Sequence, residues 1–266
     1  MPRSEALRIP RLLRDAGTEK ITFAGGEPTI CPHLAEVLRA CKEEGMTTMI
    51  VTNGTRVTDS FLEQNSRALD WVTLSVDSGV EDVEVKLGRG KGGHVALVLE
   101  VARRVRLHGC RLKVNTVVTS KNWTEDMHSL IKDLEPERWK VFQMLPIKGE
   151  NDDSLELAVT SMQFRAFLER HRDLYPIGEG NSDMTESYLM MDPLGRFFQN
   201  TGGRYQYSPS VVQVGVLDAL SVVGWDSSKF LGRGGLYDWA RASDGARIRP
   251  EGRHGEGQSN GESSLR

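Results

Sequence analysis

The feature that most constrains this fold is a regular alternation of short apolar runs with segments of helical periodicity in the first 145 residues. Five runs are predicted to be buried strands, over residues 20–24, 47–51, 70–76, 110–118 and 139–145. Helices are expected over 34–41, 59–67, 95–105 and 124–134, the last with Thr124 as its N-cap. Strand–helix alternation predicts βαβ units and a parallel sheet of the α/β class. A barrel and an open doubly wound sheet both satisfy this pattern.

The ends of the chain set the expected domain organisation. Residues 4–17 predict one helix, weakened by Pro10, with no strand before it. We therefore expect residues 1–145 to form a barrel whose first strand is missing, which leaves an uncovered sheet edge. Residues 146–239 are expected to be a C-terminal extension with helices at 161–175 and 214–223 and a hairpin at 187–199. Residues 240–266, rich in Gly, Ser, Arg and Glu, are expected to be disordered.

Composition narrows the class of partner and compartment. The 34 basic and 37 acidic side chains of the 266 residues nearly cancel, giving −3, which argues against nucleic-acid or membrane-surface binding. The three cysteines, Cys31, Cys41 and Cys110, form no C-x-x-C pair, which argues against a zinc ribbon. The longest apolar stretch, 46–51, is too short to span a bilayer, and no signal peptide is recognisable. We expect a cytoplasmic protein without a membrane segment.

Polar side chains follow the first three predicted strands, where ligands bind in parallel βα folds. The residues are Gly25, Gly26 and Glu27, then Thr52 and Asn53, then Ser75, and later Arg89 in a glycine-rich loop. Paired glycines let the backbone approach a ligand, and Glu27 suits an ammonium group. Ser75 suits a ribose, and a guanidinium suits a carboxylate or phosphate. Each group also has an ordinary interpretation as a turn, an N-cap or a basic loop.

Cations alternate along the fourth and fifth predicted strands. Lys113 and Asn115 are two residues apart, as are Arg138 and Lys140, so each pair shares one face of its strand. Pairs of cations on adjacent strands are suited to a polyphosphate, with Asn115 orienting it. A solvated outer face is the competing interpretation, and helices covering a parallel sheet argue against it.

Together these elements resemble a known family. Gly25-Gly-Glu-Pro28, Thr52-Asn-Gly54, Ser75-Val-Asp-Ser78 and Gly88-Arg-Gly90 are similar to the loops of a radical SAM domain. More narrowly, the chain resembles the viperins in Arg138-Trp-Lys-Val-Phe-Gln143, Gly149-Glu-Asn151, Phe167-Leu-Glu-Arg-His171, Ser187-Tyr-Leu189 and Arg233-Gly-Gly-Leu-Tyr-Asp-Trp239. The likeness runs from about residue 16 to residue 239, and the motifs occur in the family's order.

The resemblance implies a partial (β/α)6 barrel that binds S-adenosylmethionine at a [4Fe-4S] cluster. In this family a 5′-deoxyadenosyl radical removes a ribose hydrogen from a nucleoside triphosphate, CTP in animals. The product is a 3′-deoxy-3′,4′-didehydro nucleotide that stops viral RNA synthesis. An electron donor protein is the implied partner, and association with the endoplasmic reticulum would need a segment upstream of this sequence.

The resemblance also implies roles for single residues. The cofactor would contact Gly25, Gly26, Glu27, Thr52, Asn53, Ser75 and Arg89, and the triphosphate would contact Lys113, Asn115, Arg138 and Lys140. Arg233 closes over the γ-phosphate or forms a simple turn. Tyr188 is a hydrogen donor beside the substrate or a packed aromatic residue.

The cluster motif of the family, C-x-x-x-C-x-x-C, is absent from this sequence. Nine residues separate Cys31 from Cys41, and Cys110 lies on a distant predicted strand, so no metal ligand is assigned. We expect an incomplete sequence of an active enzyme. A truncated isoform and a relative that binds nucleotide without a cluster and without catalysis remain the competing interpretations.

Overall fold

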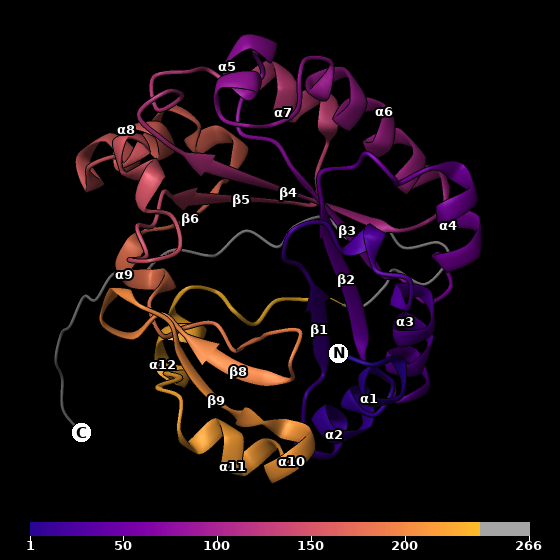
Figure 1. Ribbon diagram of the computed structural model, residues 1–266. Coiled ribbons are helices and arrows are strands. Elements are labelled where there is room, and N and C mark those ends of the chain that lie inside the picture. Colours follow the sequence, from indigo (N-terminus) through magenta and orange to yellow (C-terminus); the bar gives the residue numbers. More distant parts are fainter. Residues whose placement is uncertain (240–266) are drawn as a thin grey trace, which may run out of the picture.

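The computed structural model describes residues 1–239, and the expected disorder of 240–266 lies outside these residues. A six-stranded sheet has the order β1-β2-β3-β4-β5-β6, and every neighbouring pair is parallel. Its strands are β1 Lys20–Phe23, β2 Thr47–Thr52, β3 Trp71–Ser75, β4 Arg111–Val118, β5 Arg138–Gln143 and β6 Ile177–Glu179. Figure 1 shows the sheet curling into a partial barrel with helices on its outer side. The α/β barrel prediction is therefore confirmed, and the open sheet is excluded.

Most helices lie where periodicity places them. The described helices are α1 Arg3–Ala6, α2 Ile9–Asp15, α3 Leu34–Glu43, α4 Asp59–Asn65, α5 Glu81–Lys86, α6 His94–Leu107, α7 His128–Leu134, α8 Ser161–Arg170, α9 Asn181–Met184, α10 Val211–Val214, α11 Val216–Ser221 and α12 Ser227–Gly232.

Three helix predictions were wrong in detail. Residues 4–17 form two helices, because Pro10 occupies the first turn of α2. Thr124 is not an N-cap, since α7 begins at His128, whose backbone N–H is bound by the Asp126 carboxylate at 2.9 Å. The predicted helix at 214–223 is broken by Gly215, which has φ 88°.

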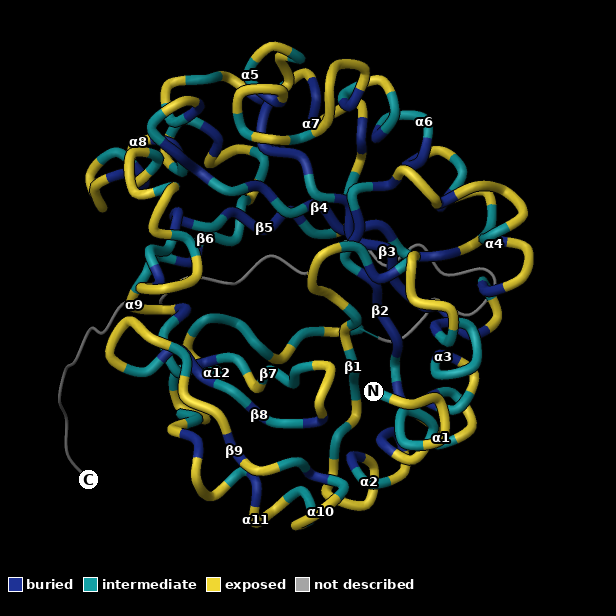
Figure 2. The backbone as a smooth tube through the Cα atoms, in the orientation of Figure 1, coloured by how far each residue is buried: buried dark blue, intermediate teal, exposed yellow. Residues whose placement is uncertain are grey.

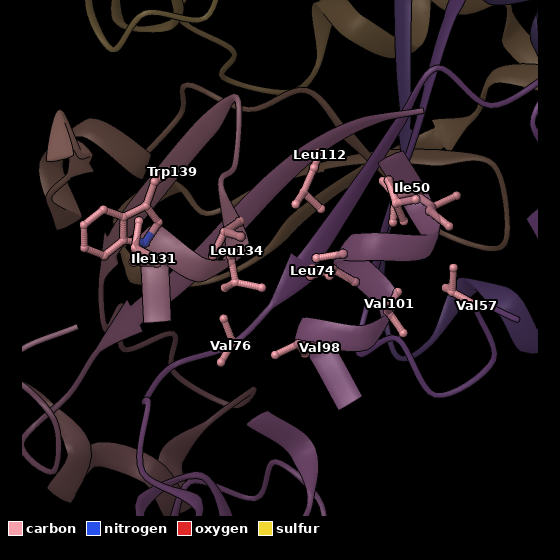
Figure 3. Packing of buried hydrophobic residues seen from close by; sticks show 14 of the residues in the cluster. Ile50, Val57, Leu74, Val76, Val98, Val101, Leu112, Ile131, Leu134 and Trp139 are labelled. Carbon is pink, nitrogen blue, oxygen red and sulfur yellow. The ribbon is translucent and has the colours of Figure 1, made fainter. Parts of the chain in front are cut away.

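The core lies between the outer face of the sheet and the covering helices. Alternate residues of β3 divide between the two faces: Leu74 is fully buried among residues of α4 and α6, whereas Ser75 faces inward. Figure 3 shows Leu74 and Val76 meeting Val98 and Val101 of α6. Figure 2 shows buried residues along the central strands and exposed residues on the outer turns of the helices. This packing fixes which side chains of each strand point into the barrel.

The C-terminal part of the chain spans the side of the barrel between β6 and β1 (Figure 1). Its strands β7 Met190–Met191, β8 Arg196–Gln199 and β9 Gln206–Ser210 form an antiparallel sheet, which confirms the predicted hairpin and adds a third strand. A second apolar cluster joins this sheet to α2 through Phe197, Val211 and Leu13. Because β6 comes from residues 177–179, the barrel sheet continues past residue 145. None of the helices in the described part has the length and apolar character needed to cross a bilayer.

Candidate functional site

Cations gather on the inner face of the barrel sheet. The strand register pairs Lys113 with Arg138 and Asn115 with Lys140, so all four side chains occupy one face, as predicted. Lys113 and Lys140 are only 6% and 5% exposed. Within residues 1–239, Lys113 makes no salt bridge and no side-chain hydrogen bond. Burial and the charges of Lys140 and Lys20 lower the pKa of Lys113 well below its usual value.

Lys20, at the start of β1, is a further cation on this face that the sequence analysis missed. Burial and the positive charges of Arg138 and Lys140 lower its pKa to about 7. Its ammonium donates to the hydroxyl of Tyr237, a residue that also lies 4.0 Å from the Arg138 guanidinium, ring centroid to Cζ. Burial also lowers the pKa of Arg138. Alternation along β1 was the signal that could have placed Lys20 inside.

Glu179 of β6 is the carboxylate that faces these cations, and it too was missed. It is fully buried and forms ion pairs with Lys140 and, at 3.0 Å, with Arg233. The Tyr188 hydroxyl donates to Glu179 and accepts from Lys140 Nζ at 2.8 Å. Burial lowers the pKa of Lys140 to about 8 against the opposing charge of Glu179. Burial and Glu179 raise the pKa of Tyr188, which keeps its hydroxyl protonated.

Arg233 therefore lies in this cation group, which we call the inner cation cluster: Lys20, Lys113, Arg138, Lys140 and Arg233. Its guanidinium stacks 3.7 Å from the centroid of the Tyr188 ring and donates to the backbone carbonyl of Ser187. The side chain is 6% exposed. The structure thus brings Arg233 and Tyr188, which lie 93 and 48 positions after Lys140 in the sequence, to the predicted polyphosphate residues.

The predicted residues at the carboxyl ends of β1 and β2 are joined through one carboxylate. Glu27 accepts from the Thr52 hydroxyl at 2.8 Å and from the Asn53 backbone N–H at 2.9 Å. Thr29 donates to the same carboxylate from its N–H at 3.1 Å. Gly25 and Gly26 have φ of 84° and 30°, and no atom lies within 4 Å of where a Cβ would stand on either. The loop therefore presents a fixed carboxylate beside open backbone.

Arg89 and Ser75 lie at the end of β3. The guanidinium of Arg89 donates from Nε to Asp77 Oδ2 at 2.7 Å, and this is its ion pair within the described chain. Ser75 pairs in register with Asn115 of β4, and Asn115 Oδ1 is a buried acceptor without a hydrogen-bond partner. Ser75 and Asn115 thereby connect the strand-end loops with the inner cation cluster. An unpartnered amide oxygen there indicates a place for a donor from a ligand.

Comparison with known proteins agrees with this arrangement. The family model described as the radical SAM superfamily matches residues 1–134. A protein of Flammeovirga pacifica named S-adenosylmethionine-dependent nucleotide dehydratase is 42% identical over 244 residues, which are 90% of this chain and 84% of that protein. The chain belongs to this radical SAM family.

Other relatives carry the same name. The nucleotide dehydratase of Lacinutrix mariniflava is 43% identical over 90% of this chain, and the chain spans about half (52%) of that protein. The nucleotide dehydratase RSAD2 of Danio rerio is 38% identical over 91% of this chain and 71% of its own. Among solved structures, Streptococcus suis SuiB bound to S-adenosylmethionine has a TM-score of 0.64, with 16% identity over 87% of this chain and 60% of its own. That likeness shows the radical SAM fold.

Radical SAM proteins use S-adenosylmethionine, and the residues present fit that cofactor. The ligand carries an ammonium, a carboxylate and a ribose. The strand ends offer the Glu27 carboxylate, the Arg89 guanidinium and the partly exposed Ser75. Among the described residues, Arg89 uses only its Nε in a side-chain hydrogen bond, to Asp77. The open backbone at Gly25 and Gly26 leaves room for close approach.

The cysteines of this sequence do not fit the iron–sulfur cluster of radical SAM proteins. Cys31 is exposed, whereas Cys41 is buried in α3 and Cys110 is buried just before β4. Burial raises the pKa of Cys41 to about 12, so it stays a thiol, and Cys110 donates to the Leu69 carbonyl at 3.2 Å. Three converging thiolates are needed, and the one candidate metal group found in residues 1–239 is Asp126, His128 and His171. No step through a cluster follows from these residues.

Proposed function

We propose that this chain binds S-adenosylmethionine at the ends of β1–β3 and a nucleoside triphosphate on the inner cation cluster, as a nucleotide dehydratase. The observation that carries the proposal is the uncompensated charge inside the barrel. Among the described residues, Glu179 forms ion pairs with two of the five cations, and burial together with the neighbouring positive charges lowers the pKa of Lys20, Lys113 and Lys140. Burying cations without anions is costly, and a triphosphate supplies several negative charges at once.

The residue roles follow from the contacts. Lys113, Arg138, Lys140, Lys20 and Arg233 would bind the phosphates, and Asn115 would accept a donor from the ligand. In this proposal Glu27 accepts the cofactor's ammonium beside Gly25 and Gly26, while Thr52 and Asn53 fix Glu27. Arg89 binds the cofactor's carboxylate, and Ser75 binds its ribose. When bound and reduced, S-adenosylmethionine supplies a radical that can remove a hydrogen atom.

Tyr188 is assigned to the reacting end of the substrate in this proposal. Its hydroxyl lies between Lys140 and Glu179 and keeps its proton because burial and Glu179 raise its pKa. A protonated phenol next to the phosphate cations is able to give a hydrogen atom or a proton to the substrate ribose. We propose a CTP-like substrate whose product is a 3′-deoxy-3′,4′-didehydro nucleotide that acts in antiviral defence.

The proposal extends to partners and location. An electron donor protein would be required by the dehydratase reaction. The cytoplasm suits the free state of the three cysteines, because disulfides are rare in reducing compartments.

Phosphate recognition is tested by titration calorimetry with CTP and with cytidine. Lys113→Ala and Lys140→Ala should each weaken CTP binding by about 1.5–3 kcal/mol, and cytidine binding much less. Lys132→Ala, an exposed lysine on α7, is the matched control and should change neither affinity. Equal losses for CTP and cytidine would show that these lysines do not contact phosphate.

A second candidate function rests on the cysteines. Because the cysteines do not converge, the chain's own residues support binding of nucleotide and S-adenosylmethionine without catalysis. Iron content and 5′-deoxyadenosine formation after anaerobic purification distinguish the two. Iron with 5′-deoxyadenosine supports the dehydratase, whereas CTP binding with neither supports the binding module.

A further inference from the structure

A buried carboxylate and imidazole lie behind the strand-end loops and touch both of them. Glu84 of α5 is fully buried, and His94 at the start of α6 is 6% exposed. His94 Nδ1 contacts Glu84 Oε2, and His94 Nε2 lies 3.3 Å from the backbone carbonyl oxygen of Asn53. The other Glu84 oxygen accepts the backbone N–H groups of Asp77 at 2.8 Å and Ser78 at 2.6 Å. One pair of side chains thus binds the loops after β2 and β3.

The pair completes an unbroken series of contacts between the two proposed ends of the cofactor site. Glu27 accepts from Asn53 N–H at 2.9 Å, and the Asn53 carbonyl meets His94. His94 meets Glu84, which holds the Asp77 backbone, and the Asp77 carboxylate accepts from Arg89 at 2.7 Å. The Arg89 backbone N–H also donates to the Glu84 carbonyl at 2.8 Å. The separation of Glu27 and Arg89 therefore depends on the pair.

The two partners of the His94 imidazole, the Glu84 carboxylate and the Asn53 carbonyl, favour its doubly protonated form. A carboxylate oxygen and a carbonyl oxygen are both acceptors, so both imidazole nitrogens must carry hydrogen for both contacts to form. Glu84 raises the pKa of His94 above its ordinary value, while burial and the Arg89 charge oppose this. The other charged groups around the pair are Asp77, Glu125, whose charge interacts with that of Glu84, and Glu81, whose carboxylate accepts the His94 backbone N–H at 2.9 Å. A neutral imidazole would lose one of its two contacts.

We infer that Glu84 and His94 are positioning residues that hold Asn53 and Arg89 at the spacing S-adenosylmethionine requires, and that they do so while the imidazole carries two protons. This inference rests on the proposed cofactor site. The raised pKa of His94 sets the direction of the pH dependence. Below this pKa both contacts of the imidazole are present, and the Asn53 contact is lost as pH rises through it. Cofactor affinity should fall over the same interval.

The test is the dissociation constant of S-adenosylmethionine, measured by calorimetry on the full chain from about pH 6 to pH 9.5, a range that spans the ordinary His value and a raised one. The α-amino group of the ligand has a pKa of about 8, and its titration affects every variant equally. We therefore compare, at each pH, the Kd of the variant divided by the Kd of the unchanged protein. His94→Gln should weaken binding about fivefold at low pH and little at high pH, where the unchanged protein has already lost the contact. The His94 imidazole pKa, measured by NMR, should match the midpoint of this change.

Glu84→Gln should give a result that a purely structural role of the pair does not predict. The introduced amide keeps an acceptor for the two backbone N–H groups and gives a donor to His94 Nδ1. A neutral imidazole then keeps its contact with the Asn53 carbonyl. At high pH the unchanged protein has lost this contact, so the variant should bind S-adenosylmethionine about fivefold more tightly there. His128→Gln is the control, because His128 is also flanked by carboxylates, those of Asp126 and Asp173, at a half-buried site on α7.

The outcomes separate this inference from the proposed function. Cofactor binding with the same pH profile in all variants overturns the role of the pair and leaves the cofactor site standing. Parallel losses in Glu84→Gln and His94→Gln at every pH show a structural role alone, which also overturns it. Failure of the unchanged chain to bind S-adenosylmethionine at any pH contradicts the cofactor site itself.

Discussion

Glu179 shows how a single side chain can organise the inner cation cluster. It accepts from Lys140, Arg233 and Tyr188 while fully buried. Glu179→Gln removes its charge and should lower the free energy of unfolding by about 1.5–3 kcal/mol, because charged hydrogen bonds are weakened in a buried site. Urea unfolding measures this loss. Glu43→Gln, exposed on α3, is the control and should leave stability unchanged.

The same variant reports on the ligand. Phosphate oxygens would accept from the same Lys140 and Arg233, so CTP should restore part of the stability lost in Glu179→Gln. A stability deficit of the same size with and without CTP would mean that the nucleotide does not reach these cations.

At the scale of single residues, the sequence predicted which face of the sheet a side chain occupies wherever the strand was long enough for the two-residue alternation to be recognised. Lys113, Asn115, Arg138 and Lys140 were placed on one face because β4 and β5 have eight and six residues. Lys20 was missed because it is the first residue of a four-residue strand, and Glu179 because its strand has three. The Glu84–His94 pair had no sequence signal, because the two residues lie ten positions apart on separate helices, α5 and α6, and no periodicity shows how these helices meet.

Within the barrel sheet, β6 is the strand that the sequence analysis did not predict. It is three residues long and contains Gly178, so no run of β-branched or aromatic residues marks it. The structure gives the reason for this glycine: a Cβ at Gly178 would collide with the side chain of Leu168 on α8. The covering helix and the strand approach closely here, and the close approach places Glu179 beside Lys140.

Gly178→Ala should therefore destabilise the protein by about 1–3 kcal/mol through overpacking against α8. Gly232→Ala is the matched control, because no atom lies within 4 Å of a Cβ built there and its backbone accepts an L residue. Thermal unfolding followed by circular dichroism compares the two. A loss in Gly178→Ala no greater than in the control would remove close packing as the reason for the glycine.

Across the whole molecule, the net charge of −3 conceals a concentration of positive charge on the inner face of the barrel, in the inner cation cluster. Buried lysines with lowered pKa values bind fewer protons than the unfolded chain, in which lysines titrate near about 10.4. Stability therefore depends on pH in the opposite direction to that expected for a lysine in a favourable ion pair. Lys20 and Lys140 make the free energy of unfolding rise as pH increases above their folded pKa values of about 7 and about 8. Bound phosphate should remove this pH dependence, because the negative charge returns these pKa values toward normal.

Triphosphate binding at about pH 8.5 should consequently take up protons, since Lys20 and Lys140 are then largely neutral in the free protein and charged in the complex. Calorimetry in two buffers of different ionisation enthalpy measures the number of protons exchanged. Below about pH 6 the uptake by these lysines should vanish, because both are already charged without ligand. Lys140→Met should reduce the uptake, whereas Lys132→Met should not. Release of protons on binding at pH 8.5, or the same uptake in Lys140→Met as in the unchanged protein, would show that the phosphates bind outside the barrel. The buried cations would then not be explained by a triphosphate ligand.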